Sequence, residues 1–366
     1  MSIKKLKRKK GYIYRVRVWR NGIAISKNFD RLYDAQQFER EVRMSADPMD
    51  VKCIFSQVSG DWLTNHAEVR KAPKSVNTDK QMLRDNILPC FGSRPLRDIS
   101  PELVELFIKK LKKDGKSSST VNRNLELIRT IFNYAIKRRK AIYNPISSVG
   151  LLKSQQPPIN YWERHEVNQF LYYVEEKCRR TGSDLGLLFK FAINTGMRLG
   201  EILGLGWSDV DFGNRLIAVR RSFDSFQGKI KNTTKSYKIR HVPINSAIYD
   251  DLIAMKARKG GELVFSTISG NPKHQSNVTH YFQRDSEEAG VRKIRFHDLR
   301  HTYASHFIMN GGDIYHLKEI LGHSDIKTTM RYAHLSKAFL VDKADTVCFK
   351  TDNVVKLEFR RAAINK

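Results

Sequence analysis

The sequence lacks the features that mark membrane-spanning and secreted proteins. No run of about 18 apolar residues occurs among its 366 residues, so we expect no membrane helix. The N-terminus is basic and has no apolar stretch of the signal-peptide kind. The chain has only four cysteines, which are far apart and form no CxxC pair: Cys53, Cys90, Cys178 and Cys348. These absences predict a cytoplasmic protein whose cysteines remain free thiols.

Acidic residues are scarce relative to basic ones. Lys and Arg number 66 against 38 Asp and Glu, which gives a net charge of +28. Such an excess favours a polyanionic partner, and we expect nucleic acid, since neutralising its phosphates releases condensed counterions. An anionic membrane surface is the alternative. It usually comes with an amphipathic basic helix carrying exposed Trp or Phe, and the sequence shows no such helix.

The first segment, residues 1–48, predicts a small sheet covered by one helix. Apolar and basic side chains alternate from Tyr12 to Trp19, which indicates a strand, and Asn21-Gly22 is a hairpin turn that returns the chain as a second strand. A β-ribbon with alternating arginines can enter a DNA groove. The residues that we expect to contact DNA are Lys4, Lys5, Arg15, Arg17 and Arg20.

The rest of the chain predicts two further segments and a tail. Residues 52–152 are mainly helical, with one helix over Thr78–Leu88 that stops near Pro89. Residues 161–345 mix helices with a hairpin region, and residues 346–366 form a tail with an alternating, strand-like piece. The predicted fold is therefore multidomain and mainly α with small β-sheets, in the order β-sheet plus helix, helical domain, and mixed α+β domain.

Four places in the third segment carry chemistry-bearing side chains. Arg198 lies at a helix start after Gly196, and lysines 229, 231, 235 and 238 lie in or beside the hairpin loop. His323 follows a helix that Asp313 caps and Gly322 ends, and the next helix, from Ile326 to about His334, carries Tyr332. Each of these residues taken alone is more typical of a solvated or packed side chain.

The fourth place is the sequence HDLRH, residues 297–301. If Asp298 caps a helix, then His297, Arg300 and His301 gather at its N-terminus, where free amides and the dipole favour a phosphate. A zinc site is the alternative, because His297 and His301 are four residues apart. The metalloprotease pattern HExxH needs an intervening Glu that is absent here, so we expect no metal.

The order of these boxes resembles the tyrosine recombinases of the phage integrase family. The resemblance is carried by TGMRLGEILGLGWSDVD, TKSYKIRHVPI, HDLRHTYASH and LGHSDIKTTMRYAHLS. It implies a site-specific DNA recombinase that cuts and rejoins DNA through a 3′-phosphotyrosine, without ATP, metal or cofactor. The catalytic residues that it implies are Arg198, Lys235, His297, Arg300, His323 and the nucleophile Tyr332.

The resemblance also assigns supporting residues and partners. It implies that Glu201 supports the first arginine and that His301 is structural, while Lys235 is matched only through its place in TKS, with other lysines nearby. It implies an arm-type DNA-binding domain over 1–48, a core-binding domain over 52–152 and a catalytic domain over 161–345. The implied partners are double-stranded DNA at attachment sites, a homo-tetramer on that DNA, and DNA-bending accessory proteins at the bacterial nucleoid.

The expected function is integration and excision of a phage or mobile element. A chromosome-dimer-resolving recombinase is an alternative, although it has no arm domain. A type IB topoisomerase uses similar chemistry with different box spacing. A catalytically silent DNA-binding protein is the non-enzyme alternative, and its mark would be a lost Tyr or Arg, which this sequence retains.

The tail, residues 346–366, is long enough to be exchanged between subunits of a tetramer. Truncation after Asp345 should therefore leave cleavage of a suicide DNA substrate intact while impairing assembly and recombination. The measurement is adduct formation beside complete recombination by the same protein. Full recombination by the truncated protein would refute the exchange.

Overall fold

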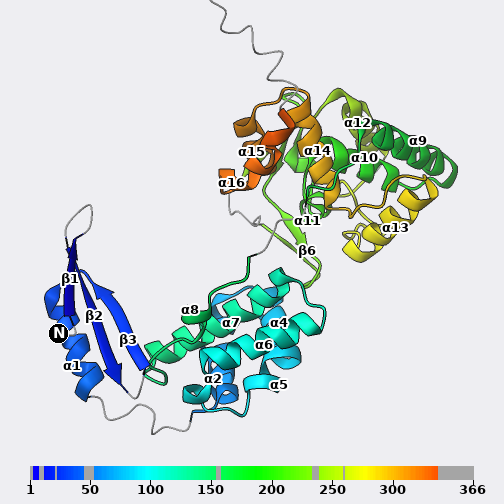
Figure 1. The fold of residues 1–366 in the computed structure, drawn as a ribbon. Coiled ribbons are helices and arrows are strands. Elements are labelled where there is room, and N and C mark those ends of the chain that lie inside the picture. Colours follow the sequence, from blue (N-terminus) through cyan, green and yellow to red (C-terminus); the bar gives the residue numbers. More distant parts are fainter. Residues whose placement is uncertain are drawn as a thin grey trace, which may run out of the picture. The chain divides into compact units, whose positions relative to one another are not determined.

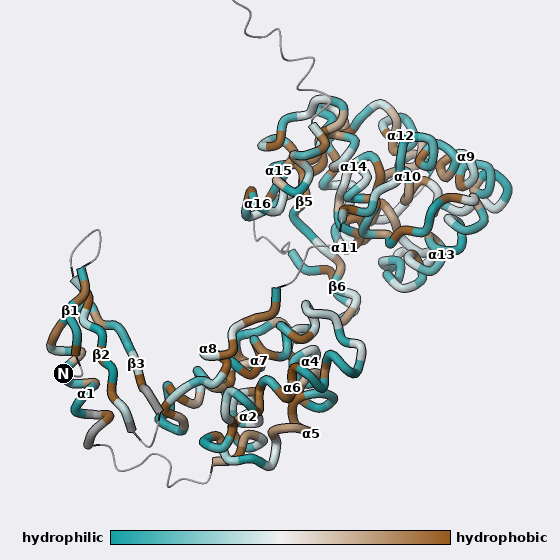
Figure 2. Tube along the Cα trace, in the orientation of Figure 1, coloured by the Kyte–Doolittle hydropathy of each residue, from teal (hydrophilic) through white to brown (hydrophobic). Residues whose placement is uncertain are grey.

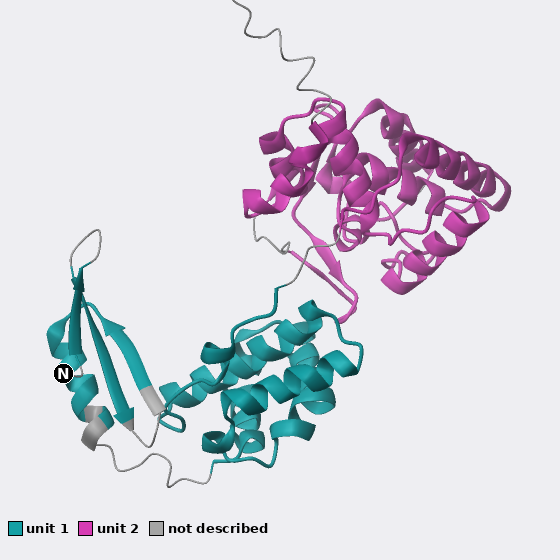
Figure 3. Cartoon of the chain, viewed as in Figure 1, with its two compact units in different colours: residues 1–156 teal, residues 157–366 magenta. Residues whose placement is uncertain are grey.

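The computed structural model describes residues 3–7, 12–20, 23–44, 53–153, 158–232, 239–258 and 260–336. The chain divides into two compact units, residues 1–156 and 157–366 (Figure 3). The mainly α fold with small sheets that the sequence predicts is confirmed. Lys235 and the tail, residues 346–366, lie outside the described residues. Among the described residues, no helix combines the length and apolar character that crossing a membrane requires.

The first unit begins with an antiparallel sheet and a covering helix. Its elements are β1 (Ile3–Lys7), β2 (Tyr12–Arg20), β3 (Ile23–Phe29) and α1 (Leu32–Met44), with β2 in the centre (Figure 1). The strand predicted from alternation is confirmed as β2: Val16 and Val18 are buried against α1, and Arg15 and Arg17 are exposed on the other face. Period-two alternation therefore separates a small core from a basic surface.

The remainder of the first unit is helical. Its segments are α2 (Phe55–Trp62), the π-helical η2 (Leu63–Ala67), α3 (Glu68–Arg70), α4 (Pro73–Met82), the π-helical η3 (Leu83–Ile87), α5 (Leu88–Phe91), the 3-10 turn η4 (Leu96–Asp98), α6 (Pro101–Lys113), α7 (Ser118–Lys137) and α8 (Ile146–Val149). They enclose a core in which Phe55, Trp62, Phe91 and Phe132 are almost fully buried. Both hydropathy colours recur along these helices in Figure 2, as expected for helices that bury only one face.

The predicted helix over Thr78–Leu88 is wrong in both of its bounds. The helical path starts at Pro73 and continues through Pro89 to Phe91. A π-helical turn explains the passage: the amide of Leu88 donates to the carbonyl of Leu83, five residues back, and Pro89 then lies in the first turn of α5, where its missing N–H is not needed.

The described part of the second unit consists of helices and two small sheets. The strands are β4 (Val210–Asp211), β5 (Leu216–Val219), β6 (Ser222–Asp224), β7 (Lys229–Lys231) and β8 (Arg240–Pro243), ordered β4-β5-β8 and β6-β7. The helical elements are α9 (Arg164–Thr181), α10 (Leu185–Thr195), α11 (Leu199–Leu203), η5 (Trp207–Asp209), α12 (Ser246–Arg258), α13 (Gln275–Glu288), α14 (Asp298–Met309), α15 (Ile314–Leu321), α16 (Ile326–Thr329) and the 3-10 helix η6 (Met330–Ser336).

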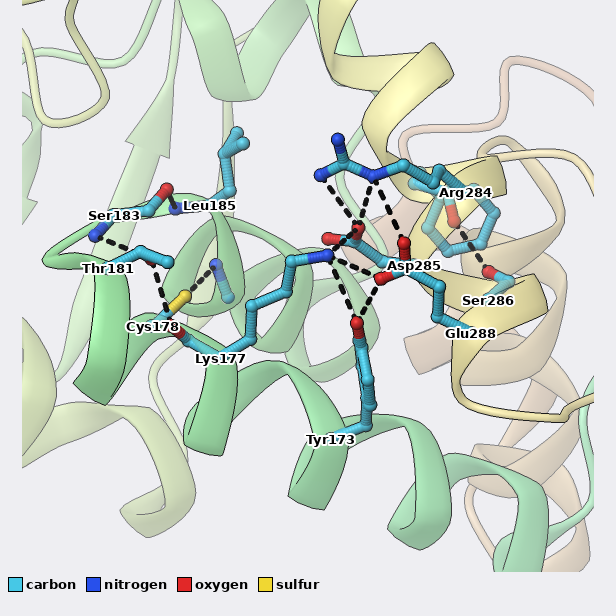
Figure 4. A network of polar contacts seen from close by, with 12 residues as sticks. Tyr173, Lys177, Cys178, Thr181, Ser183, Leu185, Arg284, Asp285, Ser286 and Glu288 are labelled. Atoms are coloured by element: carbon cyan, nitrogen blue, oxygen red, sulfur yellow. Dashed lines mark hydrogen bonds and ion pairs between the residues drawn. The ribbon is translucent and has the colours of Figure 1, made fainter.

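An aromatic cluster and an ion-pair network hold the outer helices of this unit. The centre of the Phe282 ring of α13 lies within 5.6 Å of the ring centres of Trp162, Phe170 and Phe189. Beside them, the Lys177 ammonium of α9 lies 2.8 Å from the Asp285 carboxylate and 2.6 Å from that of Glu288 (Figure 4). Helix α10 packs against α9, α12 and α14 (Figure 1), and its C-terminal end leads directly to the candidate site.

Candidate active site

The first part of the site is the turn that connects α10 to α11. Helix α10 ends at Gly196 in a left-handed conformation, and Arg198 is the residue before the first turn of α11. The Glu201 carboxylate accepts hydrogen bonds from the Arg198 backbone N–H and from its guanidinium, both at 2.9 Å. Glu201 therefore holds both ends of Arg198, whose side chain keeps 28% exposure and remains open to a ligand.

The same carboxylate also binds Arg240 at the start of β8. The Arg240 guanidinium donates to the two oxygens of Glu201 at 3.0 and 2.5 Å, and its Nε donates to the Ile320 carbonyl at 2.8 Å. Burial alone would raise the pKa of Glu201, but the hydrogen bonds and charge of Arg240, together with Arg198, lower that pKa to about 2. Glu201 is thus a permanent counter-charge.

Arg300, in the first turn of α14, bridges the same two segments through the main chain. Its guanidinium donates to the Gly196 carbonyl at 2.9 Å and to the Leu321 carbonyl at 2.6 Å, and the residue is 3% exposed. Burial and the charge of Arg198 lower the pKa of Arg300 to about 9, so it stays cationic at neutral pH. Arg240 and Arg300 together tie the Gly196–Glu201 turn to the end of α15.

His323 lies just after the C-terminal end of α15, separated from Leu321 only by Gly322, which has a left-handed conformation. Its Nδ1 lies 2.9 Å from the hydroxyl of Thr329, which is fully buried on α16. Burial, Arg300 and Arg198 lower the pKa of His323 to about 3. The imidazole is therefore neutral near pH 7, and with Thr329 occupying Nδ1, its Nε2 is the nitrogen left for a ligand.

Tyr332 lies on η6, where α14 and α16 pack against it. The helix predicted from Ile326 to about His334 starts at Ile326 with Asp325 as its cap, but it changes from α to 3-10 at Met330, and the 3-10 segment carries the tyrosine. Tyr332 is 2% exposed, and burial raises its pKa while the charges of Arg300 and Arg331 lower it. Its hydroxyl lies 2.5 Å from His301 Nδ1.

The two histidines of the HDLRH box differ in their surroundings. His297 precedes α14, is exposed, and lies edge-on to the His301 ring at 5.5 Å between ring centres. Desolvation of its ring by the surrounding residues lowers the pKa of His297, and the charges of Arg300 and Arg198 lower it further. The structural role expected of His301 stays a prediction, and the structure places its Nδ1 at the Tyr332 hydroxyl.

The predicted Asp298 cap is wrong. Asp298 is the first residue of α14, and its carboxylate accepts from the backbone N–H of Arg295 at 2.9 Å and from that residue's guanidinium at 2.7 Å. The carboxylate is thus directed back at the preceding loop, because His297 occupies the position at which a capping side chain would lie.

Some predicted residues cannot be placed with the others. Lys235 and Lys238 lie outside the described residues, and the described Lys231 is paired with Asp224 at 2.5 Å. On the N-terminal sheet Lys4, Lys5, Arg15 and Arg17 are exposed, whereas the side chain of Arg20 is not described. Across the described ranges, no group of His, Cys, Asp and Glu side chains is arranged to hold a metal ion.

Sequence reasoning missed Arg240 and Thr329. Arg240 begins the RHVP part of the TKSYKIRHVPI box, in which Lys235 was the only residue expected to be catalytic. The signal that could have found it is a buried carboxylate, Glu201, that needs more positive charge than Arg198 supplies. Thr329 gave no sequence signal, because its contact with His323 depends on the short turn of α16.

Known protein families and proteins are similar to residues in both units of the chain. The model of the phage integrase family matches residues 160–338, and that of the phage integrase central domain matches residues 55–150. The chain is 30% identical over 291 residues to the integrase of Haemophilus phage HP1, covering 76% of each chain. It is also 30% identical over 263 residues to a XerC-like tyrosine recombinase of Caldanaerobacter subterraneus, covering 63% of this chain and 66% of the relative.

The fold is also similar to that of a solved integrase. A crystal structure of a lambda integrase tetramer bound to a Holliday junction is similar with a TM-score of 0.62 and 18% identity. The similarity covers 88% of this chain and 95% of the lambda chain.

The Glu201–Arg240 ion pair should make the free energy of unfolding of the second unit depend on pH in the acid range. Because the pKa of Glu201 is about 2 rather than its ordinary 4.5, its stabilisation is present above pH 4.5 and is lost as the pH falls through 2. That difference corresponds to about 3 kcal/mol. Arg240→Met, which leaves the carboxylate buried without its main partner, should lower the free energy of unfolding at pH 7 by about 3–5 kcal/mol.

The measurement is urea unfolding of the second unit between pH 2 and pH 7. The control is Glu201→Gln combined with Arg240→Met, which removes both charges and should be less destabilised than the single variant. If Arg240→Met unfolds at the same urea concentration as the unchanged protein, Arg240 does not stabilise the site.

Proposed function

The chain belongs to the phage integrase family and is a site-specific tyrosine recombinase, and from this we propose that Tyr332 is its DNA-cleaving nucleophile. The observation that carries the proposal is the placement of Arg300. Its guanidinium bonds the carbonyls of Gly196 and Leu321, two residues before Arg198 and His323 respectively, and its charge acts on Tyr332. One side chain thus connects the segments that hold the other proposed groups.

The arrangement suits attack on a phosphodiester. Attack gives a five-coordinate phosphorus with more negative charge on its non-bridging oxygens, and the guanidinium groups of Arg198 and Arg300 can stabilise that charge. A neutral His323 can donate from Nε2 to the same oxygens. Tyr332 becomes joined to the 3′ phosphate, and the covalent bond conserves the energy of the phosphodiester, so a 5′ hydroxyl can reverse the step without ATP.

We assign the leaving-group proton to Lys235. The support is the sequence order alone: Lys235 lies five residues before Arg240, the residue whose guanidinium binds Glu201. His297, exposed and close to His301, is assigned to proton movement near the leaving 5′ oxygen or the solvent.

The other segments are proposed to position DNA. Residues 52–152 form the core-binding domain, in agreement with the central-domain match over 55–150. Residues 161–345 form the catalytic domain, and residues 346–366 the tail exchanged between subunits. Residues 1–48 form the arm-type domain: Lys4, Arg15 and Arg17 are exposed on its sheet, and the Arg17 guanidinium lies over the Trp19 ring, which is 66% exposed.

The proposed biological role is integration and excision of a phage or mobile element at attachment sites. The match to the HP1 integrase extends over 76% of this chain, against 63% for the XerC-like relative, which favours an integrase over a chromosome-dimer resolvase. The proposed active form is a homo-tetramer on double-stranded DNA, by analogy with the lambda integrase tetramer. We place this activity in the bacterial cytoplasm, at the nucleoid, with DNA-bending proteins as accessory partners, because the substrate DNA lies there.

Tyr332→Phe tests the nucleophile. The variant removes only the hydroxyl, so DNA binding should persist while the covalent protein–DNA adduct disappears. Adduct formation is measured on a nicked suicide substrate by denaturing gel electrophoresis. The matched control is Tyr303→Phe, which changes a tyrosine on α14 that packs on Phe307. An adduct formed by Tyr332→Phe would remove this tyrosine from the mechanism.

Arg15→Ala combined with Arg17→Ala tests the arm domain. Both side chains are exposed on β2, so their loss should leave the fold intact and weaken binding to arm-type DNA. Loss of two phosphate contacts should make the slope of log affinity against log salt shallower by about two. Adduct formation on a core site alone should stay unchanged. An unchanged affinity and salt slope for arm DNA would exclude this face of the sheet.

A further inference from the structure

The Tyr332 hydroxyl has a defined partner in the protein without DNA. Its Oη lies 2.5 Å from Nδ1 of His301, which is the residue after Arg300 on α14. Tyr332 is 2% exposed, so this contact is largely shielded from bulk solvent. Among the interactions recorded for the described part of the chain, His301 is the hydrogen-bond partner of Oη.

The direction of this hydrogen bond follows from the count of protons. Burial and the neighbouring His297 lower the pKa of His301 to about 4, so its ring is neutral and has one nitrogen without a proton. Burial raises the pKa of Tyr332, so the phenol keeps its single proton. If Nδ1 carried the imidazole proton, the buried phenol proton would have no acceptor among the described residues. The phenol therefore donates to Nδ1, and Nε2 carries the imidazole proton.

We propose that His301 is a catalytic residue that accepts the Tyr332 proton during attack on DNA. The proposal rests on the proposed role of Tyr332 as the nucleophile. In the step, the bond between Oη and phosphorus forms, the bond between phosphorus and the 5′ oxygen breaks, and the proton moves from Oη to Nδ1. The leaving oxygen takes its own proton from the general acid. In rejoining, the imidazolium returns the proton as Oη leaves.

The charges around His301 make proton transfer depend on DNA. Arg295, Arg331 and His297 oppose an imidazolium, and Asp298, which is 1% exposed, favours it. His323 and Arg300 face the same space. A bound phosphate brings negative charge to this mainly cationic group and raises the proton affinity of His301. His301 is thus a weak base in the free protein and becomes a stronger base when a DNA phosphate is bound.

His297 is a weaker candidate for this role. It lies edge-on to the His301 ring and makes no recorded hydrogen bond to Tyr332 within the described residues. The geometry separates the two histidines of the box: His301 contacts the nucleophile, and the exposed His297 can exchange protons with the leaving side or with solvent.

The test is single-turnover adduct formation on a suicide DNA substrate. His301→Ala should slow adduct formation about 100-fold or more near pH 7, the range for general-base catalysis. Because solvent hydroxide must then remove the phenol proton, the variant's rate should rise about tenfold per pH unit, so the deficit shrinks at high pH. Added imidazole should restore part of the rate. His306→Ala, which removes another histidine hydrogen bond from α14, is the matched control and should keep the original rate.

His301→Asn separates proton transfer from positioning. An asparagine can accept the Tyr332 hydrogen bond but cannot take the proton, so this variant should be as slow as His301→Ala. A rate near that of the unchanged protein for His301→Asn, or a deficit in His301→Ala that is independent of pH and imidazole, would reduce His301 to a positioning residue and overturn the proposal.

A measurement on the unchanged protein covers the case in which the variants do not fold. Nitrogen-15 NMR of the histidine rings reports which nitrogen of His301 carries the proton. A proton on Nε2 supports the proposal, and a proton on Nδ1 contradicts it. The NMR result does not depend on which residue is the nucleophile. An adduct formed by Tyr332→Phe, in contrast, would overturn the proposed function itself.

Discussion

The candidate site depends on one buried negative charge. Glu201 neutralises Arg240 and orients Arg198, and its charge also favours the cationic form of Arg300. Guanidinium groups as close as these repel one another, and the repulsion is strongest where water is excluded. A single carboxylate offsets part of it, which leaves the cluster with excess positive charge. An approaching phosphate therefore completes a charge balance that the protein alone leaves unfinished.

Burial first, and nearby positive charge second, keep two of the histidines neutral. His301 and His323 are desolvated and lie among arginines, and both effects disfavour an imidazolium. A neutral imidazole has one donor and one acceptor, so its second nitrogen is defined by what the first one binds. Thr329 occupies Nδ1 of His323, and Tyr332 occupies Nδ1 of His301. If both hydroxyls donate to these nitrogens, His323 offers Nε2–H as a donor, while His301 offers Nδ1 as the acceptor of the tyrosine proton.

Local signals in the sequence predicted the elements that depend on nearby residues. The alternation from Tyr12 to Trp19 predicted β2, and Asp313 and Gly322 predicted both ends of α15. The π-helical passage through Pro89 was missed, because proline usually ends a helix and the compensating bond lies five residues back. Arg240 was missed for a different reason. Its role arises from contacts with Glu201 and Ile320, which are distant in sequence, and box order alone does not reveal them. Lys235 remains a prediction from sequence order.

Arg300 reaches its neighbours through main-chain oxygens, those of Gly196 and Leu321. Every amino acid supplies the same carbonyl, so a change of side chain at either partner position leaves the acceptor in place as long as the backbone path is kept. The constraint on those positions is therefore one of shape: Gly196 is held by its left-handed backbone and by the Tyr303 ring, which a β-carbon would approach to 2.6 Å. The side chains at positions 196 and 321 therefore carry no record of these two hydrogen bonds, although the bonds connect two of the segments on which the site is built.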